Sequence, residues 1–321
     1  MVDTTITNTG GIMSSTTQTS TVRAVVTDQE GAIEVASLSR QALGDNTIRI
    51  SVAAATINPV DEFVAHGGAI ASGWSGPGRV GLGMDIAGIV TEVGAAVNNP
   101  TLQVGNRVAA LAAGAGNQIG AQADEVVVPA DAATAIPDGL DLVDAASLPL
   151  NTLTADQALN LLGEPTGALL VTGIGGGVGG YIAPLAVARG WRVVGLGRSE
   201  DRAYAESVGA ELITELSSRT TQFDAAIDSA AIGAPVLDAV RDAGAIVAVV
   251  PGLESTPSVT VQMVMVAADG TRLGELLESA ARGELPVRVR ATYPIDEAEK
   301  AYTAFRDGGR GRVVLVTGGS R

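Results

Sequence analysis

The chain has 321 residues, of which 46% are hydrophobic but only 3% aromatic, so its core must be built from Ala, Val, Leu and Ile. Its 35 acidic and 20 basic residues give a net charge of −15, which disfavours binding to nucleic acid or to an anionic membrane surface. The sequence has no cysteine and a single histidine, which excludes disulfides, thiolate ligands and multi-histidine metal sites and suits a cytoplasmic protein.

Residues 1–21 are rich in Thr and Ser and lack the basic and apolar regions of a signal peptide. We expect them to form a flexible N-terminal extension. No apolar run reaches the roughly eighteen residues that a membrane-spanning helix needs, so we expect no such helix.

Residues 22–150 show short strand patterns separated by turns. In residues 47–57, apolar residues alternate with Arg49 and Ser51, as in a strand with one buried face. Further apolar runs, broken by Gly, Asn and Pro, are residues 88–94, 106–113 and 124–130. The pattern predicts a β-rich, barrel-like domain.

From residue 151 onward, apolar strands alternate with helices. Residues 168–172 and 191–196 predict buried strands, and residues 178–190 between them predict a helix. Strands that are apolar throughout and alternate with helices indicate a parallel sheet covered on both faces. We therefore predict an α/β chain, with a doubly wound Rossmann-type domain over residues 151–283 and with residues 284–321 returning to the barrel-like domain.

Six glycines lie in the ten residues 171–180, between the first strand and the helix of this second domain. In a βαβ unit, glycines let the chain turn tightly and let backbone N–H groups approach a diphosphate at the helix N-terminus. Ile174 stands where the usual fingerprint has its first glycine. We expect a dinucleotide to bind at Gly173, Gly175, Gly176, Gly177, Val178 and Gly179.

The end of the second strand indicates which dinucleotide binds. NAD enzymes usually carry Asp or Glu there, roughly 20 residues after the glycines, to bind the ribose hydroxyls. This chain has Gly197, followed by Arg198, Ser199 and Arg202. A guanidinium in place of a carboxylate favours a 2′-phosphate, and hence NADPH. The alternative is that Arg198 is an ordinary solvated surface charge.

Several longer motifs accompany this loop: NPVD (58–61), GMDIAGIVTEVG (83–94), VGNRVAAL (104–111), ADEVVVPA (123–130), IPDGLDLVDAASLPLNTLTADQAL (136–159), TGIGGGVG (172–179) and RGRVVLV (310–316). Together they resemble the medium-chain dehydrogenase/reductase superfamily, and within it the zinc-independent quinone oxidoreductase branch. The resemblance implies a GroES-like catalytic domain and a Rossmann domain. It also implies hydride transfer from NADPH to a quinone or an α,β-unsaturated carbonyl compound.

Zinc alcohol dehydrogenases of this superfamily have Cys at the position of Asn58 and His at that of Met84, and neither replacement is a usual zinc ligand. The resemblance therefore implies a metal-free reaction, with Asn58 and Asp61 close to the nicotinamide. Asn58 would donate a hydrogen bond to a substrate oxygen as negative charge develops on it. From the residues alone, Asn58 before Pro59 is equally consistent with a turn.

The resemblance also implies a cofactor contact for Thr154, although a helix N-cap accounts for this residue equally well. Ser229, Val250 and Gly252 lie where strands end, and open α/β sheets bind ligands at the carboxyl ends of their strands. Ordinary strand-to-loop punctuation is the alternative for all three.

The sequence departs from the family at Ala65 and Ala69, where an arginine and a tyrosine are common. These changes weaken an assignment as an enoyl-thioester reductase. His66 is a further candidate proton donor, although a loop residue without a catalytic role is the more common case. Protonation by water is an alternative that requires no dedicated acid.

Two other functions remain open. One is a zinc-free carbonyl or enoyl reductase of a biosynthetic pathway, and the other is a protein that binds NADPH without turnover. By analogy with the superfamily, the apolar run 259–266 forms a late strand of the sheet and pairs two subunits in a homodimer.

Overall fold

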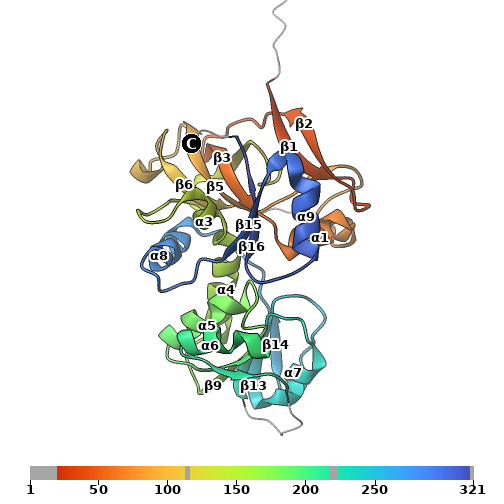
Figure 1. The fold of residues 1–321 in the computed structure, drawn as a ribbon, viewed down its shortest axis with the longest axis vertical. Helices are drawn as coiled ribbons and strands as arrows, with labels where there is room; N and C mark the ends of the chain where they lie inside the picture. Colours follow the sequence, from red (N-terminus) through yellow and green to blue (C-terminus); the bar gives the residue numbers. More distant parts are fainter. Residues whose placement is uncertain (1–19, 113–115, 217–222, 319–321) are drawn as a thin grey trace, which may run out of the picture.

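The computed structural model describes residues 20–112, 116–216 and 223–318. Figure 1 shows two parts stacked along the long axis of the molecule, with helix α4 (Pro149–Leu162) between them. The upper part holds both the N-terminal strands and the strands of the returning C-terminal segment. Nearly all of the predicted extension 1–21 lies outside the described residues, and Thr21 already begins a strand.

Two sheets make up the upper part and confirm the β-rich, barrel-like domain. The smaller sheet has the order β2-β1-β4, and the larger has the order β15-β16-β3-β5-β6-β8, with β7 also paired to β3. All of these pairs are antiparallel except β15 with β16. The strands are β1 (Thr21–Thr27), β2 (Ile33–Ser39), β3 (Thr47–Thr56), β4 (Val80–Gly81), β5 (Asp85–Val93), β6 (Arg107–Leu111), β7 (Glu125–Pro129), β8 (Ala133–Ala135), β15 (Val289–Pro294) and β16 (Arg312–Val316).

Strand β3 shows where the alternation pattern is informative and where it fails. Its apolar residues at 48, 50 and 52 are fully buried, as predicted. The expectation that Arg49 faces solvent is wrong, because only 3% of this residue is exposed. Its guanidinium donates to Glu92 Oε1 (3.1 Å) and Glu125 Oε1 (2.7 Å) on neighbouring strands, and ion pairing permits a buried charge.

The lower part contains the predicted parallel sheet, with strand order β11-β10-β9-β12-β13-β14. This order confirms the doubly wound Rossmann-type fold, because it reverses at β9 and β12, where such sheets bind ligands. Its strands are β9 (Ala168–Thr172), β10 (Arg192–Leu196), β11 (Glu211–Ile213), β12 (Phe223–Asp228), β13 (Val240–Ala248) and β14 (Thr260–Met263), and α5 (Gly179–Ala188), α6 (Arg202–Ser207) and α7 (Ala234–Ala239) accompany them.

The remaining helices lie on or beside the upper part. They are α1 (Pro59–Ala65), α2 (Gly68–Ala71), α3 (Leu142–Ala146), α8 (Gly270–Ala281) and α9 (Ala298–Arg306). Helix α8 falls in the range predicted for the lower domain, yet it packs on β8 and α4, as its place in Figure 1 shows. Gly270 permits this approach, since a Cβ there would lie 2.3 Å from the carbonyl oxygen of Ala133.

One hydrophobic cluster runs through both parts. It joins Ala54 and Met84 of the upper part to Val171 and Ile174 of the lower part. Because the cluster is continuous, we expect the two parts to be stabilised together rather than as independent units. None of the helices in the described ranges combines the length and the apolar character that a membrane crossing requires.

Candidate functional site

The glycine-rich loop connects β9 to α5 at the carboxyl end of the parallel sheet, as predicted. Gly173 has φ = +65°, a left-handed conformation that favours glycine, and a Cβ there would lie 3.0 Å from Ala230 Cβ. A Cβ at Gly179 would lie 2.3 Å from the carbonyl oxygen of Gly173. The loop is therefore tightly folded on itself and against the end of β12.

A pocket of about 350 Å³ opens beside this loop, at the carboxyl ends of β9, β10, β11 and β12. Two of the residues predicted to bind the dinucleotide, Gly173 and Gly197, form part of its wall. The full lining is Gly173, Leu196, Gly197, Thr214, Glu215, Leu216, Ala230, Ile232 and Pro235. The position and the mostly apolar lining fit the nucleoside end of a dinucleotide.

The basic residues predicted at the end of β10 are on the surface. Arg198 has a side chain that is 80% exposed, and its Nη1 lies 3.6 Å from Glu200 Oε1. Arg310, from the C-terminal segment, places its Nη2 3.3 Å from the same oxygen. Ser199 and Arg202 are also exposed. Two guanidinium groups from different parts of the chain thus flank one carboxylate at the end of β10.

The other predicted cofactor residues lie at several places. The Ser229 hydroxyl donates to the carbonyl oxygen of Thr172 at the base of the glycine-rich loop. Val250 is 44% exposed just after β13, and Gly252 follows with φ = +119°. Thr154 is buried inside α4 and donates to the carbonyl oxygen of Leu150 (2.6 Å). The N-cap alternative for Thr154 is wrong, because α4 begins at Pro149.

Asn58 lies at the centre of a buried polar network between the two parts. Its Nδ2 donates to Asp85 Oδ2 (2.8 Å), and its Oδ1 accepts from Arg312 Nη2. Arg312 Nη2 also donates to the carbonyl oxygen of Ile57 (3.1 Å). With its amide oxygen turned toward the guanidinium, Asn151 accepts from Arg312 Nη1 (2.9 Å). Asn58 is fully buried, so a substrate oxygen reaches it only if this network opens.

Asp61 closes the first turn of α1 beside this network. Its Oδ2 accepts from the backbone N–H of Asn58 (2.7 Å), and its Oδ1 accepts from the N–H of Gly83 (2.9 Å). Burial raises the pKa of Asp61 to about 7, although these two hydrogen bonds oppose the shift. Burial also raises the pKa of Asp85 to about 6, while the charge of Arg312 lowers it. Burial therefore makes both carboxyl groups weaker acids than exposed aspartates are.

Sequence reasoning missed Asp85, Asn151 and Arg312 as individual residues, although all three lie within motifs that carried the family resemblance. A charged residue inside an apolar motif was the available signal: Asp85 precedes IAGIV, and Arg312 precedes VVLV. The structure brings these residues together with Asn58, whereas Thr154 and Val250 do not join the network.

His66 and the positions that depart from the family lie at the C-terminal end of α1 and in α2. The imidazole is 58% exposed, and its Nδ1 lies 2.8 Å from the carbonyl oxygen of Glu62, in the preceding turn of α1. Ala65 and Ala69 are fully buried. Among the described residues, no three His, Cys, Asp or Glu side chains are grouped closely enough to hold a metal ion.

Comparisons with known proteins agree with this architecture. The alcohol dehydrogenase GroES-like domain family matches residues 44–138, which form most of the upper part. The quinone oxidoreductase from Coxiella burnetii has the same fold, with a TM-score of 0.80 and 25% identity over 92% of this chain and 99% of that one. The chain therefore has the two-domain α/β fold of the medium-chain dehydrogenases/reductases, to which it is similar.

Two curated proteins are also similar to this chain. The chain is 27% identical over 243 residues to the chloroplastic NADPH-dependent alkenal/one oxidoreductase of Arabidopsis thaliana, covering 71% of this chain and 62% of that protein. This chain is also 32% identical to the pikromycin polyketide synthase component PikAII of Streptomyces venezuelae. The match extends over 202 residues, which are 62% of this chain. It spans only 5% of that synthase.

Proposed function

We propose that the protein is an NADPH-dependent oxidoreductase that transfers a hydride to a quinone or to an α,β-unsaturated carbonyl compound. The observation that carries the proposal is the glycine-rich loop and its adjoining pocket at the point where the strand order reverses. The similarity to an alkenal/one oxidoreductase and to a quinone oxidoreductase supports the substrate class.

The residues of the loop fit the dinucleotide. The N–H groups of Gly177 and Val178 donate to no other group among the described residues, so they are free to bind a diphosphate. Position 197 has no carboxylate for the ribose, and Arg198 and Arg310 share one carboxylate oxygen beside it. This arrangement supports a 2′-phosphate and hence NADPH. We assign Ser199, Arg202, Ser229, Val250 and Gly252 to the borders of the same site, and Thr154 to its floor.

NADPH, when bound, supplies the hydride. The chain would position the coenzyme and the acceptor, exclude water and polarise the accepting oxygen. We assign the last role to the Asn58 amide, which an acceptor reaches once the buried network opens, and whose Nδ2 carries a second hydrogen besides the one donated to Asp85. Asp61 would hold Asn58 through its backbone N–H. Protonation of the product by water completes the reaction.

We further propose that hydride transfer proceeds without a metal, because Asn58 and Met84 replace the usual ligands. A homodimer is the expected assembly, since β14 forms an edge of the parallel sheet, and Met263 in this strand and Met265 just after it are 41% and 64% exposed. With a net charge of −15, neither nucleic acid nor an anionic membrane is an expected partner, and we expect a cytoplasmic location.

The two alternative functions keep specific support. The match to part of a polyketide synthase component favours a zinc-free carbonyl or enoyl reductase of a biosynthetic pathway. The buried Ala65 and Ala69, in place of polar family residues, favour a protein that binds NADPH without turnover.

An acceptor screen separates these functions. The protein would be incubated with NADPH and a panel of quinones, enals and enones, with NADPH oxidation followed by absorbance and the products identified by mass spectrometry. We expect steady oxidation and saturation of C=C bonds or formation of hydroquinones. Alcohols with intact C=C bonds would favour the carbonyl reductase, and tight NADPH binding without oxidation would favour the protein without turnover.

Arg198→Ala tests the coenzyme assignment. We expect the KM for NADPH to rise about tenfold, because a charge-assisted contact to the 2′-phosphate is lost. The KM for NADH should stay nearly unchanged. Equal effects on both coenzymes would reject the role of Arg198.

A further inference from the structure

Arg288 lies just before β15 in the upper part, yet its guanidinium contacts the glycine-rich loop of the lower part. Its Nη2 donates to the carbonyl oxygen of Gly176 (2.9 Å), and its Nη1 lies 3.4 Å from the carbonyl oxygen of Gly175. The guanidinium carbon lies 5.6 Å from the ring centre of Tyr181 and 5.0 Å from that of Tyr204. These contacts fix the side chain from several directions.

The lower part has a socket for this guanidinium. A Cβ at Gly180 would lie 1.9 Å from Arg288 Nη2, so only glycine leaves the space. Pro184, four residues further along α5, has no N–H to donate to the carbonyl oxygen of Gly180. The hydroxyl of Tyr204 donates to that oxygen instead, which holds its ring beside Arg288.

We propose that Arg288 is a positioning residue that orients the glycine-rich loop for the coenzyme diphosphate from the carbonyl side. The inference rests on the proposed dinucleotide function. In a trans peptide, the C=O of one residue and the N–H of the next point in opposite directions. By holding the carbonyl oxygen of Gly176, Arg288 directs the N–H of Gly177 to the opposite side, where it has no partner among the described residues.

The charge of Arg288 strengthens the same N–H as a donor. A cation bound to the carbonyl end of a peptide group polarises that group, so that its N–H becomes a better donor to an anion. The effect acts on the diphosphate, which NADPH and NADH share, and not on the ribose end. Arg288 therefore supports binding of both coenzymes, whereas Arg198 is expected to distinguish them.

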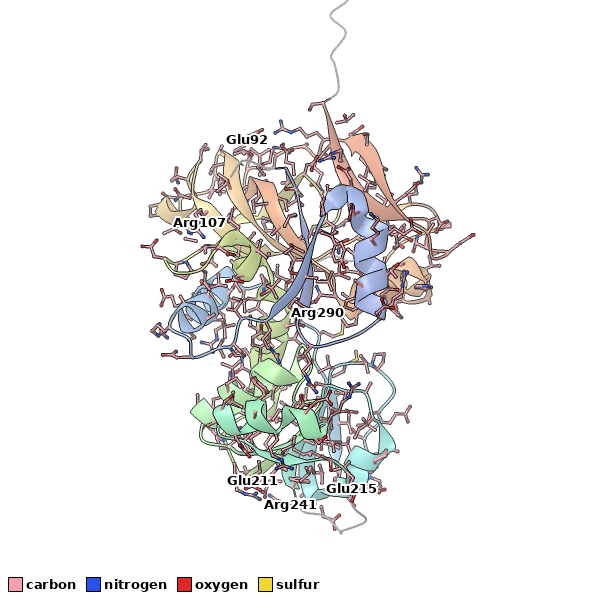
Figure 2. The ribbon with its side chains drawn as sticks, viewed as in Figure 1. Glu92, Arg107, Glu211, Glu215, Arg241 and Arg290 are labelled. Carbon is pink, nitrogen blue, oxygen red and sulfur yellow. The ribbon has the colours of Figure 1, made fainter. Side chains whose placement is uncertain are left out.

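The test is calorimetric titration of NADPH and NADH into the full chain and into Arg288→Ala and Arg288→Lys. We expect both dissociation constants to rise about tenfold, by the same factor, in each variant, because lysine cannot bridge two carbonyl oxygens while stacking on two rings. Arg290→Ala is the matched control, since Arg290 Nη2 donates to the backbone carbonyl oxygen of Ala304 in α9 (2.8 Å). Figure 2 labels its position.

Gly180→Ala provides a second variant, which keeps the arginine at position 288 but removes the space for its guanidinium. The added Cβ would displace the guanidinium, so this variant should lose the same coenzyme affinity as Arg288→Ala. The variant with both substitutions should bind the coenzymes no more weakly than either single variant does. If Arg288→Ala and Gly180→Ala bind the coenzymes as tightly as the wild type does, the role of Arg288 is overturned, whereas the proposed function still stands. Binding of neither coenzyme by the wild type would overturn the proposed function as well.

Discussion

Asp61 and Asp85 are carboxyl groups whose ionisation depends on their buried surroundings. Both are buried, and burial raises the pKa of Asp61 to about 7 and that of Asp85 to about 6. An unfolded chain ionises the same groups near pH 4. Between these pH values the native state binds more protons than the unfolded state, so stability must fall as pH rises through this window.

Asp61→Asn tests this pH dependence. We expect the free energy of unfolding of the wild type, relative to the variant, to fall by about 2 kcal/mol between pH 5 and pH 8, because the variant has no proton to lose. Urea unfolding at each pH measures the difference. Asp296→Asn removes an exposed carboxylate of a surface ion pair and serves as the control. A difference that is independent of pH would contradict the raised pKa.

Among the structural elements, the glycine-rich loop leaves space for side chains of neighbouring segments as well as for a ligand. A Cβ at Gly175 would lie 1.9 Å from Asp201 Oδ1 and would overlap Arg310, the two partners of an ion pair between the parts. A Cβ at Gly177 would lie 3.1 Å from Arg312 Nη1. Side chains of the returning C-terminal segment thus take up space that the absent side chains leave.

Gly175→Ala is expected to displace the Arg310–Asp201 pair and to lower stability by about 2 kcal/mol, as overpacking typically does. Thermal and urea unfolding would measure the loss. Gly76→Ala is the matched control, because a Cβ at Gly76 meets nothing within 4 Å and its backbone is not left-handed. Equal stability of the two variants would show that the ion pair does not pack on Gly175.

The local sequence predicted the bounds of strands and helices well where buried residues recur at a regular spacing. The β9 strand matches the predicted residues 168–172, and α5 begins within one residue of its predicted start. The alternating pattern predicted the wrong environment for Arg49. A strand pattern does not show that carboxylates on two neighbouring strands will surround a guanidinium. Such contacts depend on pairing between distant segments.

At the scale of the whole molecule, the arginines of the C-terminal segment hold the site together. Arg288, Arg310 and Arg312 come from within 25 positions of one another, and all three reach the loop between residues 173 and 180. The sequence indicated that residues 284–321 rejoin the first domain. It did not indicate that this segment would bring three guanidinium groups to the loop, because no local sequence pattern encodes the distance between these side chains and the glycine-rich loop.

We predict that two chains associate through the edge strand β14. If two chains pair there, light scattering should give twice the mass of one chain for the wild type. Met263→Glu with Met265→Glu should reduce it to the mass of one chain, because charge on an edge strand opposes pairing. The matched change Leu161→Glu, on exposed helix surface, should leave the dimer intact. A wild type with the mass of one chain would refute the proposed homodimer.

We propose that the loop at the end of β9 binds a phosphorylated nicotinamide dinucleotide. Calorimetric titration of the wild-type chain with NADPH and with NADH measures this binding. We expect saturable binding of one NADPH per chain, at least about tenfold tighter than that of NADH, since the 2′-phosphate adds a charge-assisted contact. No saturable binding of either coenzyme, or tighter binding of NADH, would contradict it.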